Sequence, residues 1–225
     1  MSDLHASRLN IYNPIHKALR AFMGDTLNRS ARMDAHDEAD VAEGLAQIRE
    51  LLGVLRGHLK HESEFVHVAM EARAPGSTAT AEGDHAHHVA DIGNLEMMCD
   101  LVQQSAAAAR EVQLGHLHRM LSVFVGENLV HMNMEETANN AVLWAHYSDG
   151  ELMAIEQAIV ATIPPEQQQK TMKWMLPALT PSERASMFLG MRANAPAPVF
   201  NGMLMLAKGL LDARDAHKLD LALAA

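Results

Sequence analysis

Apolar residues recur every three or four positions through much of the chain, which is the pattern of helices that turn one face toward a core. In one such segment Leu45, Ile48 and Leu52 lie on a single helical face. The same spacing returns in three other segments. It predicts four long helices, at about residues 13–28, 40–72, 83–109 and 112–147.

Turn-forming residues separate these predicted helices unevenly. The polar residues 28–40 form the first connection, and the sequence APGSTATAEGD at 74–84 forms the second. The third connection is weakly marked, because the run SAAAAREVQ at 105–113 itself favours a helix. The lengths of the segments favour an up-down four-helix bundle.

A fifth helix is predicted after the break Ser-Asp-Gly at 148–150. Ser148 and Glu151 have the spacing of a capping box, which satisfies free N–H groups at a helix start. This helix covers about residues 149–162. Together with the bundle it completes a first domain, residues 1–162.

The remaining residues, 163–225, are expected to form three or four shorter helices packed on the bundle. Thr180 and Glu183 mark a clear helix start. Each proline begins or ends a helix, since proline lacks the N–H that an interior position needs. The prolines of this segment are Pro164, Pro165, Pro177, Pro181, Pro196 and Pro198.

Composition supports an all-α fold class. Aromatic residues make up only 4% of the chain, and Ala, Leu, Met and Glu dominate. These residues lose little side-chain entropy in a helix. A chain of 225 residues is long enough to bury a full core.

Charge and cysteine content limit which binding partners and which cellular compartment are expected. The formal net charge is −10 without a Lys/Arg cluster, so nucleic acid is not an expected partner. Apolar runs fall short of the roughly 20 residues of a membrane span, and the N-terminus lacks a signal-peptide layout. The single cysteine, Cys99, fits a reducing compartment. We therefore expect a cytoplasmic protein without a membrane partner.

Histidine is the residue type that points to chemistry. The chain contains 14 histidines, and histidine is the commonest metal ligand. Two segments place a histidine four residues before a glutamate: His58 with Glu62, and His131 with Glu135. Residues four apart share one face of a helix, so each pair can offer an imidazole and a carboxylate to one metal centre.

Both pairs interrupt apolar faces, where a buried carboxylate needs a compensating cation. The first and third predicted helices add His16 and His85 to inward stripes. The midpoint between His16 and His58 is residue 37, inside the first connection, and that between His85 and His131 is residue 108. All four histidines can thus meet in one layer of an up-down bundle, where bundles build metal sites.

The arrangement resembles the hemerythrin-like (HHE cation-binding) domains over about residues 10–160. The matching stretches are IHKALR around His16, HLKHESEF around His58, DHAHH around His85 and HMNMEET around His131. Each stretch is weak by itself. Their order and spacing make the resemblance specific.

The resemblance implies two non-haem irons per chain, although the same ligands would accept zinc or manganese. By this comparison His16 and His58 bind one iron and His85 and His131 the other. Glu62 and Glu135 bridge them. A small gaseous ligand such as O2 or NO is then the expected partner, with oxygen binding, sensing or iron handling as the function.

Two features depart from the oxygen-carrying hemerythrins. Those proteins have two ligand histidines four apart on the third helix, whereas Ala81 lies four residues before His85. His88 is the only inward substitute, as an additional or replacement ligand. Glu135 also follows its histidine by four residues instead of five. Both departures favour sensing, redox or iron-related roles over simple oxygen carriage.

Two alternatives stay open. A di-iron oxidase or peroxide-consuming enzyme would use the same metals, but the sequence shows no dedicated general acid, so a binding protein is favoured over an enzyme. A metal-free helical scaffold would use its C-terminal helices for interaction. A homo-oligomer is compatible with either reading.

Overall fold

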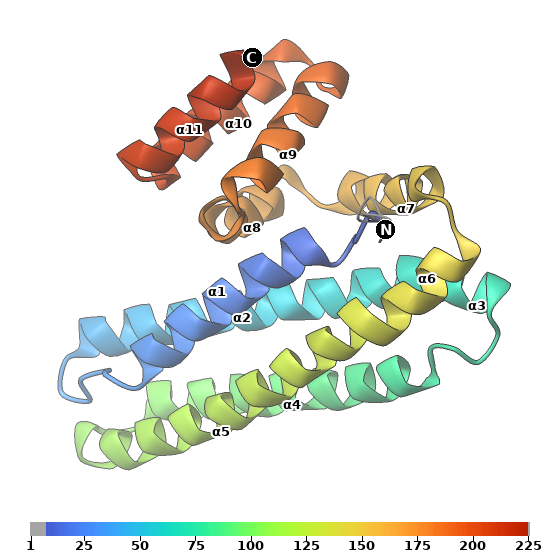
Figure 1. The fold of residues 1–225 in the computed structure, drawn as a ribbon. Coiled ribbons are helices and arrows are strands. Elements are labelled where there is room, and N and C mark those ends of the chain that lie inside the picture. The colour runs from blue at the N-terminus through green and yellow to red at the C-terminus, as the bar shows by residue number, and fades with distance from the viewer. Residues whose placement is uncertain (1–7, 225) are drawn as a thin grey trace, which may run out of the picture. The chain divides into compact units, whose positions relative to one another are not determined.

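The computed structural model describes residues 8–224, and within them all regular structure is helical, as Figure 1 shows. The all-α class expected from the sequence is confirmed. Residues 1–7, on which part of the signal-peptide argument rests, and residue 225 lie outside the described residues. The helices, with π-helices marked η, are α1 (Asn13–Ser30), α2 (Glu38–His61), η1 (Glu62–His67), α3 (Val68–Arg73), α4 (Ala79–Gln104), α5 (Ala107–Met134), η2 (Glu135–Asn139), α6 (Asn140–His146), α7 (Asp149–Thr162), α8 (Pro165–Ala178), α9 (Pro181–Asn194), α10 (Ala197–Leu210) and α11 (Ala213–Ala224).

Two of the long predicted helices contain a π-helical turn. The second predicted helix consists of α2, η1 and α3 in succession, and the fourth consists of α5, η2 and α6. The π turns begin at Glu62 and at Glu135. A π turn bonds residue i to residue i+5, and such turns are frequent at functional sites. The glutamate of each His-x-x-x-Glu motif therefore lies where the helical geometry changes.

The turn between α4 and α5 lies at Ser105 and Ala106, so the predicted ends at residues 109 and 112 are wrong. Ser105 Oγ donates a hydrogen bond to the carbonyl of Leu101 at 2.7 Å, where α4 ends. Arg110 donates to the carbonyls of Ser105 and Ala35, each at 3.1 Å. Because Ala35 is distant in the sequence, the tertiary structure selects this turn within an alanine run that favours helix on both sides.

Contacts between Cα atoms divide the described chain into two units. The first contains residues 8–13 and 22–163, and the second contains residues 14–21 and 164–224. Helix α1 therefore contributes residues to both units. The predicted first domain, residues 1–162, includes residues 14–21, which group here with the second unit.

In the first unit α4 packs against both α2 and α5. The apolar stripes of these helices are buried between them; they include Leu45, Ile48, Leu52, Leu55, Ile92, Leu95, Cys99, Leu117, Leu121 and Phe124. A second apolar cluster is formed around Tyr12, Val66, Met70, Leu143 and Leu152; Val66 and Met70 follow the first motif in the chain, and Leu143 and Leu152 follow the second. The His-x-x-x-Glu motifs thus lie between two apolar layers of one unit.

The second unit has its own core. Leu176, Phe188, Ala207 and Leu219 are buried together, one from each of α8, α9, α10 and α11. The side chain of Arg184 is buried beside this cluster and pairs with Asp215. The four helices agree with the three or four expected after residue 163.

The predicted capping box at Ser148 is present, and the predicted helix start at Thr180 also carries one. Ser148 Oγ accepts the N–H of Glu151 at 3.3 Å, and Glu151 Oε2 accepts the N–H of Ser148 at 2.8 Å. Thr180 and Glu183 repeat this exchange at 3.3 and 2.7 Å. Local sequence signals therefore set the starts of α7 and α9.

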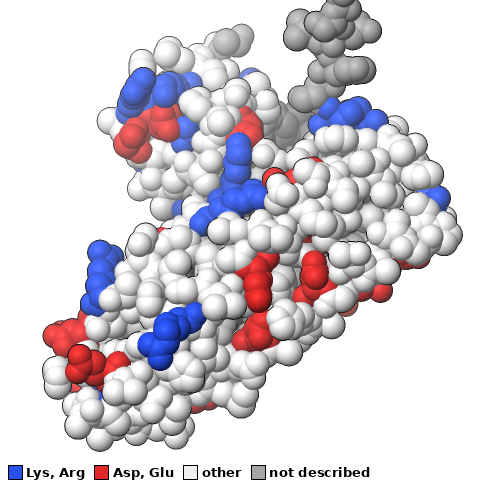
Figure 2. Space-filling model, turned by 60° about the horizontal axis from the view of Figure 1, so that its bottom comes forward, with Lys and Arg blue, Asp and Glu red and all other residues white. Residues whose placement is uncertain are grey.

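No helix in the described part of the chain has both the length and the apolar character of a membrane span. On the face shown in Figure 2, Lys and Arg lie in several separate groups among Asp and Glu. Charges of both signs are thus interspersed there.

Candidate metal centre

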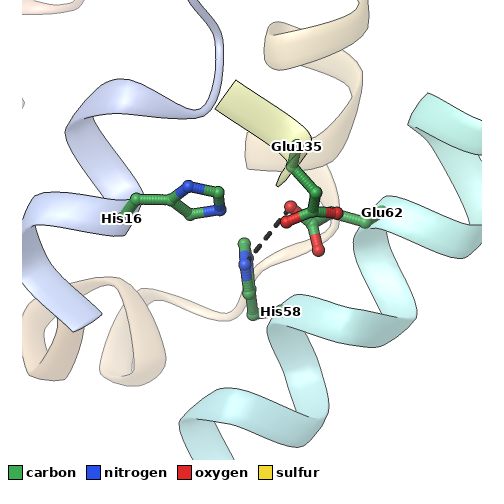
Figure 3. Close-up of side chains that lie close together, drawn as sticks. All are labelled: His16, His58, Glu62 and Glu135. Carbon is green, nitrogen blue, oxygen red and sulfur yellow. Dashed lines mark ion pairs between the residues drawn. The ribbon is translucent and has the colours of Figure 1, made fainter. Parts of the chain in front are cut away.

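The first motif brings an imidazole and a carboxylate together at the junction of α2 and η1. His58 lies in the last turn of α2, and Glu62 is the first residue of η1. The Nε2 atom of His58 is 3.2 Å from Oε1 of Glu62. Figure 3 shows His58, Glu62 and Glu135 pointing toward one another. Glu62 is only 3% exposed, so its carboxylate lies inside the protein.

The second motif has the same form at the junction of α5 and η2. His131 lies in the last turn of α5, and Glu135 is the first residue of η2. The Nε2 atom of His131 is 3.4 Å from Oε2 of Glu135. Glu135 is completely buried. Two similar motifs from different helices therefore place their carboxylates in one interior region.

His85 of α4 lies between the two motifs. Its Nε2 atom is 3.6 Å from Oε2 of Glu62 and 3.6 Å from Oε1 of Glu135. The same atom is 3.1 Å from Nε2 of His131. Glu62, His85, His131 and Glu135 each offer one ligand atom, and these atoms all lie within 4.8 Å of one another. This distance range is compatible with one metal ion bound among them.

Two polar side chains hold the other nitrogen of these imidazoles. Ser63 Oγ is 2.8 Å from Nδ1 of His85, and Asp84 Oδ2 is 3.2 Å from Nδ1 of His131. Partners of this kind orient metal-binding histidines and determine which nitrogen faces the metal. Here they leave Nε2 of both histidines directed at the carboxylates. Neither Ser63 nor Asp84 was predicted as part of the site.

The electrostatics of the centre follow from burial. Burial raises the pKa of Glu62 well above its ordinary value, and a hydrogen bond with Glu135 partly opposes this shift. Burial lowers the pKa of His85 to about 4, against the opposing charges of Asp84 and Glu82. Neutral imidazoles are the form that binds metals, and ionised carboxylates at this depth require a cation. The donor set therefore fits a divalent metal such as iron, zinc or manganese.

Tyr12 adds a buried phenol beside the carboxylates. Asn139 of η2 donates a hydrogen bond to its hydroxyl at 3.4 Å. Burial raises the pKa of Tyr12 well above its ordinary value, and the nearby charges of Glu135 and Glu62 raise it further. The sequence favours a packing role for this residue, whereas its hydroxyl also bonds to the π turn that begins with Glu135.

His16 is completely buried on α1, in the segment that groups with the second unit. It is also labelled in Figure 3. It follows Tyr12 by four residues and precedes Met23 by seven, so the three residues share one face of the helix. Tyr12 and Met23 belong to the first unit and are buried. The side of α1 that carries His16 is thus the buried side.

His88 and His67 lie around the centre without joining the group of Glu62, His85, His131 and Glu135. His88 is buried and packs edge-on against the ring of His131 at 5.0 Å and that of Phe124 at 6.0 Å. Burial lowers its pKa to about 4. In this structure His88 packs beside His131, so an additional or replacement ligand role for it stays a prediction.

His67 contacts the centre although the sequence suggests only a structural role. Its ring stacks on that of His85 with 4.7 Å between centroids, and its side chain is 1% exposed. Burial lowers its pKa to about 4. In a regular α-helix His67, the fifth residue after Glu62, would face away from the side of the helix that carries Glu62. The i to i+5 bonding of η1 brings His67 back to that side. The only sequence signal is the histidine itself.

Comparisons of the chain with protein-family models, with curated proteins and with solved structures find no match. The site must therefore be interpreted from its own geometry.

Proposed function

We propose that this chain is a non-haem metal-binding protein of the hemerythrin-like class, with two iron ions per chain. In this proposal α1, α2 to α3, α4 and α5 to α6 form an up-down four-helix bundle around the metals. The supporting observation is a pair of buried glutamates, Glu62 and Glu135, surrounded by the Nε2 atoms of His58, His85 and His131.

The orientation of the carboxylates supports two metals rather than one. Glu62 directs Oε1 toward His58 and Oε2 toward His85. Glu135 directs Oε1 toward His85 and Oε2 toward His131. A carboxylate whose two oxygens face different imidazoles is suited to bridge two cations. We assign the His85 and His131 imidazoles to one cation and the His58 imidazole to the other.

His16 completes this assignment as the second imidazole on the His58 side. The resemblance assigns this role to His16, and its burial on the same face as Tyr12 supports it. The same ligand set would also accept zinc or manganese in place of iron.

The bound irons would supply the affinity for a small gaseous ligand such as O2 or NO. The protein's own contribution is to hold the imidazoles and exclude water. Ser63 and Asp84 fix the imidazole orientations, and the apolar clusters on either side keep the site dry. We therefore propose binding, sensing or iron handling as the function.

Metal analysis of the purified protein after anaerobic loading with Fe2+ tests the proposal. We expect two irons per chain and a new visible absorption on exposure to O2 or NO. His58→Ala should lower the iron content, whereas His116→Ala, which removes an exposed histidine on α5, should not. A loaded protein without stoichiometric iron would refute the proposal. Turnover of peroxide, or of O2 with a reductant, would instead favour the redox enzyme.

A further inference from the structure

A second group of ligand-type side chains lies on the exposed surface of α4 and α5, apart from the buried centre. The Nε2 atom of His87 is 3.2 Å from Oδ2 of Asp91 and 3.7 Å from Oε2 of Glu127. One ligand atom from each of the three lies within 4.8 Å of the others. The side chain of His87 is 62% exposed, so the group faces solvent.

The backbone holds these three side chains in place. His87 and Asp91 are four residues apart on α4 and so share a face one turn apart. Glu127 comes from α5, whose register against α4 is held by the buried ring of His88 between Phe124 and His131. Neighbouring histidines on α4 thus point in different directions, His88 to the interior and His87 to the surface. The three ligands are brought together before any ion binds.

The chemistry of the three groups selects the kind of ion. One imidazole and two carboxylates carry two negative charges when the imidazole is neutral, which a divalent cation would neutralise. An imidazole nitrogen favours zinc, cobalt or nickel over magnesium and calcium, which prefer oxygen ligands alone. Three protein ligands leave room for water at the remaining positions.

We propose that His87, Asp91 and Glu127 form an exposed site for a divalent transition metal such as Zn2+ or Co2+. The site is separate from the buried centre and does not depend on its occupancy. Because it is open to solvent, its ion exchanges readily and is removed by a chelator. The bound ion links α4 to α5 and stabilises this helix pair, since it binds the folded protein in preference to the unfolded chain.

Equilibrium dialysis with Zn2+, and titration with Co2+ followed by its visible absorption, test the proposal on the full chain. We expect His87→Ala and Glu127→Gln each to lower the affinity for one bound ion by at least about tenfold. Loss of a side chain that only orients a ligand already lowers the affinity of metal sites by about tenfold. His116→Ala, a matched exposed histidine on α5, should bind as the wild type does. Mg2+ should compete poorly.

The same titration on His131→Ala separates this site from the buried one. Ions lost in His131→Ala belong to the buried centre, and ions lost in His87→Ala belong to the surface site, so either proposal can fail alone. Equal Zn2+ binding by wild type and His87→Ala would overturn the surface site. Binding of Mg2+ as strongly as Zn2+ would also overturn it, because it would indicate carboxylates acting without the imidazole.

Discussion

Replacement of Asp84 separates the metal-binding role of the centre from its structural role. The Oδ2 atom of Asp84 is 3.2 Å from Nδ1 of His131, and its side chain is 44% exposed. Because this carboxylate is half exposed, Asp84→Ala should change the stability of the metal-free protein by no more than about 0.5–1 kcal/mol. Loss of an outer partner should nevertheless weaken metal binding about 10–100-fold.

The weaker binding translates into a stability difference that appears only with metal. Each tenfold change in affinity is about 1.4 kcal/mol, so the loaded Asp84→Ala protein should lose about 1.4–2.8 kcal/mol more than the metal-free protein at the same free metal concentration. Urea unfolding with and without Fe2+ under anaerobic conditions measures both values. Glu82→Ala, which removes another exposed carboxylate from α4, controls for the loss of charge.

Two results would refute this reasoning. Equal losses of stability with and without metal would mean that Asp84 acts only as a surface ion pair. An unchanged metal affinity would mean that His131 is not held by Asp84 for metal binding, or that it is not a ligand.

Two further predictions concern stability away from the centre. Arg73 and the Ser148 cap hold the pKa of Glu151 down to about 2, so the stability that Glu151 contributes is present above its unfolded pKa and is lost as the pH falls toward 2. The melting temperatures of wild type and Glu151→Gln should therefore differ at pH 7 and converge in acid. A constant difference across this pH range would contradict the ion pair between Glu151 and Arg73. Phe188→Ala should destabilise the second unit by about 3–5 kcal/mol, because the ring is completely buried in its core. Denaturant unfolding measures this loss of stability. A loss below about 1 kcal/mol would contradict the place of Phe188 in that core.

Sequence reasoning succeeded where short-range rules decide the outcome. Helical periodicity predicted the stripes that α2, α4 and α5 bury, and the capping box at Ser148 and the helix start at Thr180 formed as predicted. The spacing of His58 and Glu62, and of His131 and Glu135, placed each pair on one helical face. These features depend on residues within one or two turns of each other.

Only the tertiary structure decided the features that depend on distant residues. The π turns at Glu62 and Glu135 change the helical period, and this change brings His67 against His85. The α4 to α5 turn depends on Arg110 reaching Ala35 from another part of the chain.

The orienting partners of the candidate ligands belong to the same class. Ser63 lies in η1 and meets His85 because α2, which η1 continues, packs against α4; Asp84 meets His131 because α4 packs against α5. The sequence alone determined which residue types lie on each helical face, because side-chain direction follows the local helical period. Packing determined which of those faces meet, because contacts between helices join residues that no local pattern links.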